Sequence, residues 1–221
     1  MSKTILITGA NRGIGLSLAN LYQKRGDKVI ATCRHISDAL RNLDVQVIEG
    51  IDVRSPDVGQ WLNDALGDTH VDILINNAGI LRDERLGQLD FSTIEEQWQV
   101  NTLGPLRITE SLLSKLGPGS KVAFITSRMG SIADNTSGGR YGYRMSKCAL
   151  NAAAVSLAHD LAPRNISVAL LHPGLVGTDM IGGHGNVTPD EAASQLSERI
   201  DGLNQANSGT FWHASGEVLP W

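Results

Sequence analysis

The 221-residue chain is poor in the features that mark several classes of protein. It has two cysteines, Cys33 and Cys148, which are too few for a disulfide framework. We therefore expect both to be thiols of a cytoplasmic protein. The longest apolar runs have the length of a strand, so we expect neither a membrane-spanning helix nor a signal peptide.

The chain also lacks a large excess of either positive or negative charge. The 19 Lys and Arg residues and the 23 Asp and Glu residues give a net charge of −4, and the sequence contains neither a basic run nor a zinc-type spacing of Cys and His. We therefore expect a small-molecule substrate and no metal, with neither nucleic acid nor a membrane as partner.

What the chain does contain is an alternation of short apolar runs and amphipathic segments. The predicted strands are residues 4–8, 28–33, 45–49, 71–76, 121–126 and 166–171. The predicted helices are residues 14–25, 56–66, 91–115 and 143–161. This order predicts an α/β fold with a doubly wound parallel sheet and helices on both faces, as one domain over residues 1–221.

A glycine-rich turn follows the first predicted strand, in Thr8-Gly-Ala-Asn-Arg-Gly-Ile-Gly15. Gly9, Gly13 and Gly15 would allow a tight turn, a close approach of the backbone to a pyrophosphate, and packing of the next helix on the sheet. The free N–H groups at the start of that helix would face the phosphates. A turn with only a structural role is the alternative.

Tyr143 and Lys147 lie four residues apart in a helical segment, so their side chains share one face. A neighbouring ammonium favours the phenolate and lowers the pKa of a tyrosine from about 10. Tyr141 is the rival tyrosine, but Met145 at its i+4 position carries no charge. We therefore predict that Tyr143 acts as a general acid whose pKa is lowered by Lys147.

Ser127 and Asn101 are further candidates for a catalytic role. Ser127 closes the fifth predicted strand, where ligands of open α/β sheets gather, and its hydroxyl would orient a carbonyl. Ser131 is the rival serine, but it does not end the strand directly. Asn101 lies inside the long predicted helix, which Gly104-Pro105 would disturb locally. A satisfied surface amide is the alternative for Asn101.

These motifs, together with Asn76-Asn-Ala-Gly79 and the pattern Ser127-x-x-Gly130, resemble the short-chain dehydrogenase/reductase family over essentially the whole chain. The resemblance implies a Rossmann-type fold, a nicotinamide dinucleotide, and hydride transfer between it and a carbonyl or alcohol. It also implies that Lys147 holds the nicotinamide ribose and that Asn101 holds a water in the proton relay. Residues 127–139, 143–151 and 219–221 are similar to the C-factor and sniffer-like carbonyl reductase branch.

The choice of cofactor follows from charge. Sites for NAD commonly place an acid at the end of the second strand, but Cys33 and Arg34 stand there in this chain. Arg12 in the glycine loop would lie nearby, and two guanidinium groups would clamp a 2′-phosphate. We therefore predict NADP(H) in preference to NAD(H). The alternative is that either arginine merely faces solvent.

The predicted site falls into two sets. The predicted catalytic residues are Asn101, Ser127, Tyr143 and Lys147. The predicted cofactor contacts are Gly9, Asn11, Arg12, Gly13, Ile14, Gly15, Arg34, Asp52, Val53, Asn77, Ala78, Gly79, Tyr143, Lys147, Pro173, Gly174, Val176 and Thr178. The resemblance implies that Asp52 receives the adenine amino group and that Val176 and Thr178 contact the carboxamide.

The substrate side is less defined by the sequence. The glycine-rich segment 179–187 is predicted to be a mobile substrate lid, and Thr188 with Pro189 to begin a helix. Tyr141, Met129 and Leu175 are expected to form a mixed apolar pocket. The family often makes dimers or tetramers, and extra apolar positions on the helices 91–115 and 143–161 fit a homo-oligomer.

The leading hypothesis is an NADPH-dependent carbonyl reductase of this family with Tyr143 as general acid/base. The alternative is an NADP(H)-binding signalling or regulatory protein of C-factor type, in which occupancy of the nucleotide site controls a partner surface. The four catalytic positions favour turnover, whereas a pure sensor needs none.

Overall fold

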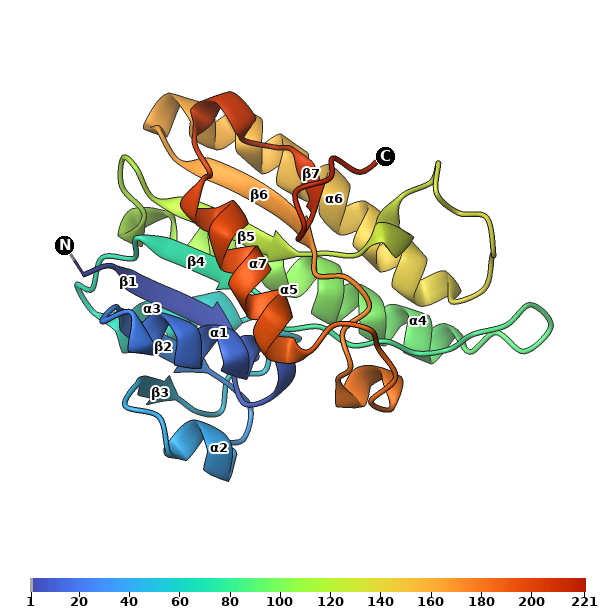
Figure 1. Ribbon diagram of the computed structural model, residues 1–221, viewed down its shortest axis with the longest axis horizontal. Helices are drawn as coiled ribbons and strands as arrows, with labels where there is room; N and C mark the ends of the chain where they lie inside the picture. The colour runs from blue at the N-terminus through green and yellow to red at the C-terminus, as the bar shows by residue number, and fades with distance from the viewer. Residues whose placement is uncertain (1) are drawn as a thin grey trace.

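The computed structural model describes residues 2–221. Within them, seven parallel strands form one sheet in the order β3-β2-β1-β4-β5-β6-β7 (Figure 1). Their bounds are β1 Thr4–Thr8, β2 Lys28–Thr32, β3 Gln46–Ile48, β4 Ile73–Asn76, β5 Lys121–Ile125, β6 Ser167–His172 and β7 Phe211–His213. The central strands are buried on both faces, which explains their continuous apolar sequences.

Helices cover both faces of this sheet. Their bounds are α1 Gly13–Lys24, α2 Asp38–Arg41, α3 Val58–Leu66, α4 Phe91–Trp98, α5 Gly104–Ser111, α6 Tyr141–Leu161 and α7 Pro189–Asp201. A π-helical turn, η1 (Gln99–Leu103), joins α4 to α5. Short 3₁₀ turns are η2 Leu113–Lys115, η3 Arg128–Gly130, η4 Ala162–Arg164, η5 Asp179–Ile181 and η6 Gln205–Asn207.

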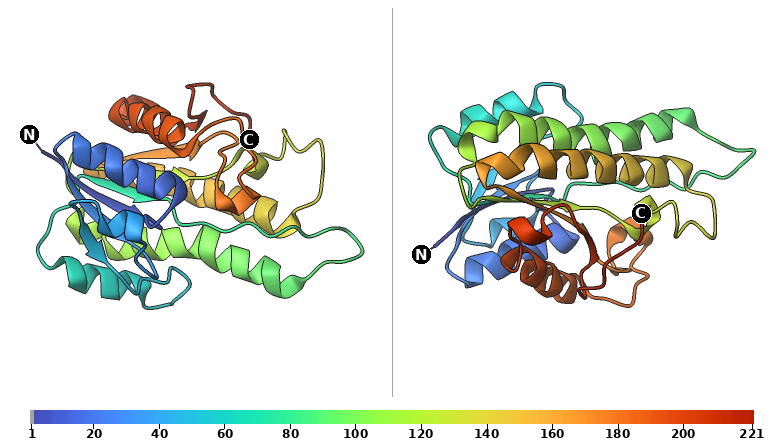
Figure 2. Two further views of the ribbon diagram at one scale, coloured as in Figure 1. Left: turned by 60° about the horizontal axis from the view of Figure 1, so that its bottom comes forward. Right: turned by 90° about the horizontal axis from the view of Figure 1, so that it is seen from above.

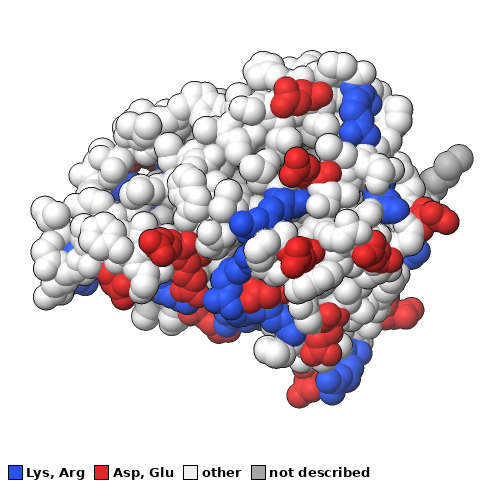
Figure 3. Space-filling model, turned by 180° about the vertical axis from the view of Figure 1, so that it is seen from behind, with Lys and Arg blue, Asp and Glu red and all other residues white. Residues whose placement is uncertain are grey.

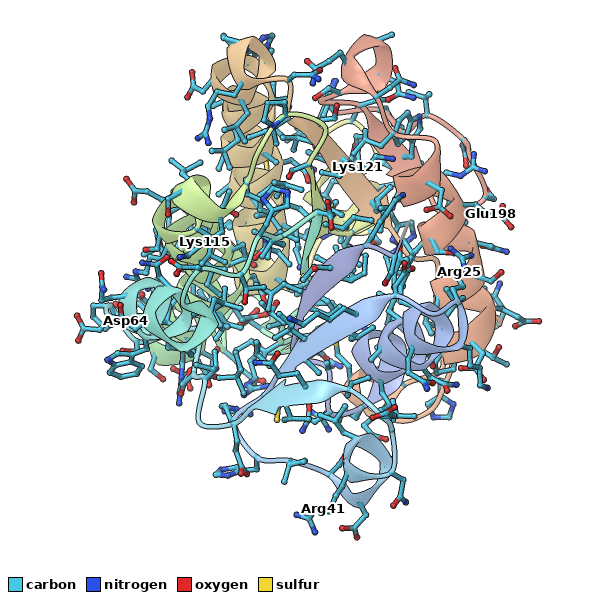
Figure 4. The ribbon with its side chains drawn as sticks, turned by 90° about the vertical axis from the view of Figure 1, so that its left-hand side faces the viewer. Arg25, Arg41, Asp64, Lys115, Lys121 and Glu198 are labelled. Atoms are coloured by element: carbon cyan, nitrogen blue, oxygen red, sulfur yellow. The ribbon has the colours of Figure 1, made fainter. Side chains whose placement is uncertain are left out.

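The sheet separates two hydrophobic cores. Figures 2 and 4 show the helices that lie on its two sides. Helices α1 and α7 pack on one face through side chains such as Leu18 and Leu196, while α3, α5 and α6 pack on the other. Polar contacts fix α7 as well, because Lys121 Nζ donates to the carbonyl oxygens of Ile200 and Asp201 at 2.7 and 2.8 Å. Arg25 at the end of α1 also reaches Asp201, at 2.8 Å (Figure 4).

The order of the strands positions the candidate site. Strands β1 and β4 are neighbours, and the connections from the two halves of the sheet leave in opposite directions at this point. In open parallel sheets, ligands bind at the carboxyl ends of the strands beside such a switch point. The turns after β1, β4 and β5 all end there, so the glycine loop, Asn77 and Ser127 meet at one edge.

The structure confirms the predicted fold class and the six predicted strands, with ends that differ by one or two residues. It adds β7 and α2, which are three and four residues long. The prediction of one helix over residues 91–115 was wrong, because α4, η1, α5 and η2 occupy that range. Pro105 has no N–H to donate to the carbonyl of Asn101, four residues back, as an α-helix requires. The N–H of Gly104 donates to the carbonyl of Gln99, five residues back, which is the π-helical pattern.

Two properties of the whole molecule bear on its partners. In residues 2–221, the helices are too short or too polar to cross a membrane. On the face drawn in Figure 3, Lys and Arg side chains lie next to Asp and Glu side chains. The two signs are therefore mixed where charges occur on this face, and the upper left part of the view has few of them.

Candidate active site

Tyr143 and Lys147 lie on the buried face of α6, as their spacing predicts. Their exposed fractions are 8% and 4%. The ammonium Nζ of Lys147 lies 5.9 Å from the centre of the Tyr143 ring and donates to the carbonyl oxygen of Ile125 at 2.8 Å. Helix α6 therefore fixes the phenol and the ammonium side by side at the carboxyl end of β5.

The charges around these two groups differ from the sequence-based expectation. Burial raises the pKa of Tyr143, while a hydrogen bond with Ser127 and the positive charge of Arg140 oppose that rise. The pKa of Tyr143 is therefore raised rather than lowered in this structure, and the contribution of Lys147 to it stays a prediction. Burial also lowers the pKa of Lys147 to about 8, so its side chain loses its proton and its positive charge as the pH rises above that value.

Ser127 follows β5 and adjoins Tyr143, and its position depends on Gly130. The Ser127 hydroxyl accepts a hydrogen bond from the N–H of Met129 at 3.1 Å, which starts the turn η3. A Cβ on Gly130 would lie 2.7 Å from the main-chain carbon of Lys147, so only glycine lets η3 pack on α6. Ser131 instead accepts a hydrogen bond from the N–H of Asp134, at 3.1 Å.

Asn101 is fully buried in the π-helical turn, so the alternative of a surface amide is wrong. Its Oδ1 accepts from the N–H of Ile80 at 2.9 Å, and its Nδ2 donates to the Ile80 oxygen and to Ser146 Oγ at 2.9 and 3.0 Å. The side chain thus braces the loop after β4 against α6.

A cleft of about 660 Å³ opens at the switch point of the sheet. It is lined by Tyr143, Lys147 and these further predicted cofactor contacts: Gly9, Asn11, Arg12, Gly13, Ile14, Gly15, Arg34, Asp52, Val53, Asn77, Ala78, Gly79, Pro173 and Thr178. The predicted contacts Gly174 and Val176 lie outside it. Val176 is buried, and its backbone pairs with that of Val187.

The glycine loop forms a cradle that a dinucleotide would fit. A Cβ on Gly9 would lie 2.9 Å from Ala78 Cα, and one on Gly15 would lie 2.5 Å from Asn77 Nδ2. Asn77 in turn donates to the oxygens of Thr8 and Gly9 at 2.9 and 3.1 Å, which joins this loop to the end of β4. Within residues 2–221, α1 starts with neither a side-chain cap nor an acid in its first turn. Its N–H groups therefore remain for an anion.

The charged lining of the cleft contains residues that sequence reasoning missed. Arg54 binds Asp52 through both carboxylate oxygens, with Nη2 to Oδ2 at 2.6 Å, and lowers the pKa of that carboxyl group. Glu96 pairs with Arg82 at 3.0 Å and with Arg54 at 3.5 Å. The adjacency of Arg54 to Asp52 along the chain was the available signal, whereas Glu96 reaches the cleft from α4.

The segment predicted as a mobile lid is folded back on itself. The N–H of Gly177 donates to Val187 at 2.9 Å, and those of Gly183 and Asn186 donate to Thr178 and Leu175. Asp179 at its start pairs with Arg12 of the glycine loop at 3.2 Å. His184 is exposed. The segment therefore has its own hydrogen-bonded structure, anchored to the other side of the cleft.

The expected apolar substrate pocket takes another form. Met129 lines a separate hollow of about 440 Å³ between η3 and the outer face of α6, together with Ile132, Met145 and Cys148. Tyr141 and Leu175 line neither this hollow nor the main cleft, and Leu175 is largely exposed. As predicted, Thr188 and Pro189 begin a helix, α7. The structure adds a capping box between Thr188 and Glu191.

A doubly wound parallel sheet with a glycine-lined cleft at its switch point is the architecture of Rossmann-type proteins. The model of the family described as "short chain dehydrogenase" matches residues 3–186, and the chain belongs to this family of oxidoreductases. It is 40% identical to 1-hydroxy-2-glutathionyl-2-methyl-3-butene dehydrogenase of Rhodococcus sp. (strain AD45), over 99% of both chains. It is 45% identical to C-signal of Myxococcus xanthus, over 68% of this chain and 93% of that protein.

Solved structures agree with this assignment. The carbonyl reductase Sniffer of D. melanogaster superposes with a TM-score of 0.91 at 31% identity, covering 100% of both chains. The NADPH-bound carbonyl reductase from chicken fatty liver superposes with a TM-score of 0.88 at 28% identity, covering 100% of this chain and 99% of that one. The resemblance to the short-chain dehydrogenase/reductase family, including its C-factor and sniffer-like branch, is thereby confirmed.

Proposed function

We propose that this protein is an NADP(H)-dependent carbonyl reductase that transfers a hydride between the nicotinamide and a carbonyl or alcohol substrate. The observation that carries the proposal is the meeting of Ser127, Tyr143 and Lys147 beside a cleft that also contains the glycine cradle. Similarity to carbonyl reductases, one of them with NADPH bound, supports it.

The residues present suit a nicotinamide dinucleotide. The start of α1 and the glycine loop would hold the pyrophosphate, and Arg34 with Arg12 would hold a 2′-phosphate. Lys147 would hold the ribose attached to the nicotinamide, and Pro173 and Thr178 would lie beside the nicotinamide ring. When bound, the nicotinamide supplies or accepts the hydride.

The chain's own groups handle the proton. In the reducing direction, Tyr143 Oη donates a proton to the carbonyl oxygen, which the Ser127 hydroxyl orients. Burial keeps the pKa of Tyr143 high, so the phenol is protonated before the reaction and acts as an acid. Lys147 carries a positive charge below a pH of about 8 and stabilises the phenolate left behind.

The decisive experiment measures oxidation of NADPH by purified protein across aldehydes, ketones and quinones, with a glutathione-conjugated carbonyl included because of the Rhodococcus relative. Tyr143→Phe should lower kcat by about 10²- to 10⁴-fold, the usual contribution of a general acid, while NADPH still binds. Tyr141→Phe is the matched control and should retain turnover. Turnover that survives Tyr143→Phe would contradict the proposal.

A second candidate function is regulatory, and the 45% identity to C-signal favours it. In this role NADP(H) occupancy would control a surface that a partner reads. Tight binding of NADPH without turnover of any carbonyl in the panel would favour this role over catalysis. Full cellular function of the Tyr143→Phe variant would favour it as well.

A further inference from the structure

The helix that carries Tyr143 and Lys147 begins without a cap of its own. Arg140, the residue before α6, has left-handed backbone angles (φ 51°, ψ 49°), and within residues 2–221 its side chain makes no capping hydrogen bond. The first turn of α6 holds no acidic residue. Because the N–H groups of a first helical turn have no partners inside the helix, another part of the molecule must satisfy them.

A carboxylate from a distant segment supplies the missing acceptor. Glu84 lies in the loop between β4 and α4 and is only 3% exposed. Its Oε2 accepts a hydrogen bond from the N–H of Gly142 at 3.2 Å, and its main-chain oxygen accepts one from Arg140 at 2.9 Å. Figures 1 and 2 show this loop and the start of α6 at the same end of the molecule. Negative charge is favourable at the N-terminus of a helix.

The other carboxylate oxygen is held by α4. Glu84 Oε1 accepts from Thr93 Oγ1 at 2.9 Å and from the side-chain amide of Gln97, which is fully buried. The Oε1 of Gln97 accepts in turn from the N–H of Arg82 at 2.9 Å. Gln97 and Gly142 donate to it, as a buried carboxylate requires, and the single proton of the Thr93 hydroxyl can go either to this carboxylate or to the Asp90 oxygen. The carboxylate therefore joins α4 to the first turn of α6.

Gly142 is shaped for this contact. A Cβ at this position would lie 2.5 Å from Gln97 Nε2, 2.9 Å from Ile94 Cα and 3.0 Å from Glu84 Oε1. The backbone of Gly142 is helical, so close approach of α4 and Glu84, rather than a left-handed conformation, accounts for the glycine. The packing and the hydrogen bonds thus agree on one arrangement.

We propose that Glu84 is a positioning residue for the reaction. By fixing the N–H of Gly142, it sets the start of α6 and thereby the place of Tyr143, the next residue, against Ser127. Glu84 lies outside the cleft and acts only through the helix. The inference rests on the proposed function, because it takes Tyr143 as the general acid.

The first test is Glu84→Gln, whose amide N–H₂ must face another donor, either the N–H of Gly142 or the side-chain amide of Gln97. We expect kcat to fall about ten-fold or more, because small misplacements of a catalytic group are costly. The KM for NADPH should change by less than about two-fold, since the glycine cradle is untouched. Glu95→Gln, an exposed acid on the same helix α4, is the matched control and should leave kcat unchanged.

A rescue separates hydrogen bonding from general loss of packing. In the double variant Glu84→Gln/Gln97→Glu, the new carboxylate at 97 can accept from Arg82 and from the amide at 84. The amide oxygen at 84 can still accept from Gly142, and Thr93 already has the Asp90 oxygen as an acceptor at 3.0 Å. We therefore expect the exchange to recover kcat to within about three-fold of the original value.

Amide hydrogen exchange of residues 141–147 gives a readout that needs no substrate. Glu84→Gln should speed exchange in this first turn, and Glu95→Gln should not. Faster exchange with an unchanged kcat would show that Glu84 is only a structural cap, and would overturn the proposal. Unchanged exchange in Glu84→Gln would overturn it as well, because Glu84 would then not fix the start of α6. If the unaltered protein reduces no carbonyl, the proposed function is wrong, and Glu84 cannot position a reaction. Hydrogen exchange would still show whether Glu84 caps α6.

Discussion

At the scale of single residues, the cofactor end of the cleft depends on how its arginines are paired. Arg54 is committed to Asp52, and Arg12 is paired with Asp179 through side chains that are 65% and 77% exposed. The charge of Arg34 acts on the same Asp52, where it helps lower the pKa of the carboxyl group. A 2′-phosphate would therefore meet Arg34 directly but would compete with Asp179 for Arg12.

This pairing leads to opposite effects of two substitutions. Arg34→Ala should raise the KM for NADPH about ten-fold or more, because charge-assisted contacts to a phosphate are strong, and should change the KM for NADH little. Asp179→Asn should lower the KM for NADPH, but only by a few-fold, because exposed ion pairs contribute about 0–1 kcal/mol. Steady-state kinetics with both cofactors measures both effects. An equal rise in the KM for NADPH and for NADH in Arg34→Ala would contradict the proposed contact of Arg34 with the 2′-phosphate.

At the scale of elements, the site is assembled by short turns that a periodic pattern does not reveal. The glycine loop and the shared face of Tyr143 and Lys147 could be predicted, because each is encoded within one stretch of sequence. The π-helical turn at Asn101, the pairing of Glu96 with Arg82 and the Glu84 contact to α6 could not. They depend on residues that become neighbours only when the loop after β4, α4 and α6 pack together.

The turn η3 gives a prediction of this kind. In Gly130→Ala, the new methyl group would clash with the main chain of Lys147, so η3 must move away from α6 and take Ser127 with it. We expect a loss of about 1–3 kcal/mol in the free energy of unfolding, as for other overpacked sites, together with a lower kcat. Thermal unfolding and turnover measure these effects.

Gly202→Ala is the matched control for that variant. Its Cβ would lie 3.5 Å from the Glu198 oxygen, which is an ordinary contact, so stability and kcat should be retained. Full stability and activity in Gly130→Ala would show that η3 tolerates a side chain and that the close packing on α6 is not required.

At the scale of the whole molecule, the sheet could be predicted except at its far edge. The six predicted strands are apolar runs rich in Val and Ile, whereas β7 has three residues and reads Phe-Trp-His. It is held by pairing with β6, in which His172 lies opposite His213, and their rings pack edge to face with centroids 5.1 Å apart. A strand so short takes its conformation from its neighbour rather than from its own sequence.

The partly buried His172 predicts acid sensitivity. Burial lowers its pKa to about 3, with the charges of His213 and Arg128 adding to the effect, whereas in the unfolded chain it titrates near its usual value of about 6.5. The unfolded state therefore binds more protons between these values. Stability from this group is complete above about pH 6.5 and falls as the pH drops toward 3, by about 1.4 kcal/mol per unit once well inside that window.

Unfolding temperatures at pH 7.5 and pH 5 test this prediction. The loss on acidification should be smaller in His172→Gln than in the unaltered protein, because the variant has no proton to gain there. His159→Gln removes an exposed histidine and should keep the original pH dependence. If all three proteins lose the same amount, another group governs the acid response.

The capping of α6 by Glu84 has a consequence for which part of the neighbouring chain can vary. Because the start of α6 is fixed from the loop after β4, the largely exposed loop residues 134–137 need not hold Tyr143 in place, although Ser137 accepts a hydrogen bond from Arg144 at 2.9 Å. That loop can change in length or sequence, through evolution or by grafting, while the proton donor stays in register with Ser127. Libraries confined to residues 134–137 should therefore retain folding, whereas Gly138 and Gly139 have left-handed φ values of 63° and 65° and should be kept.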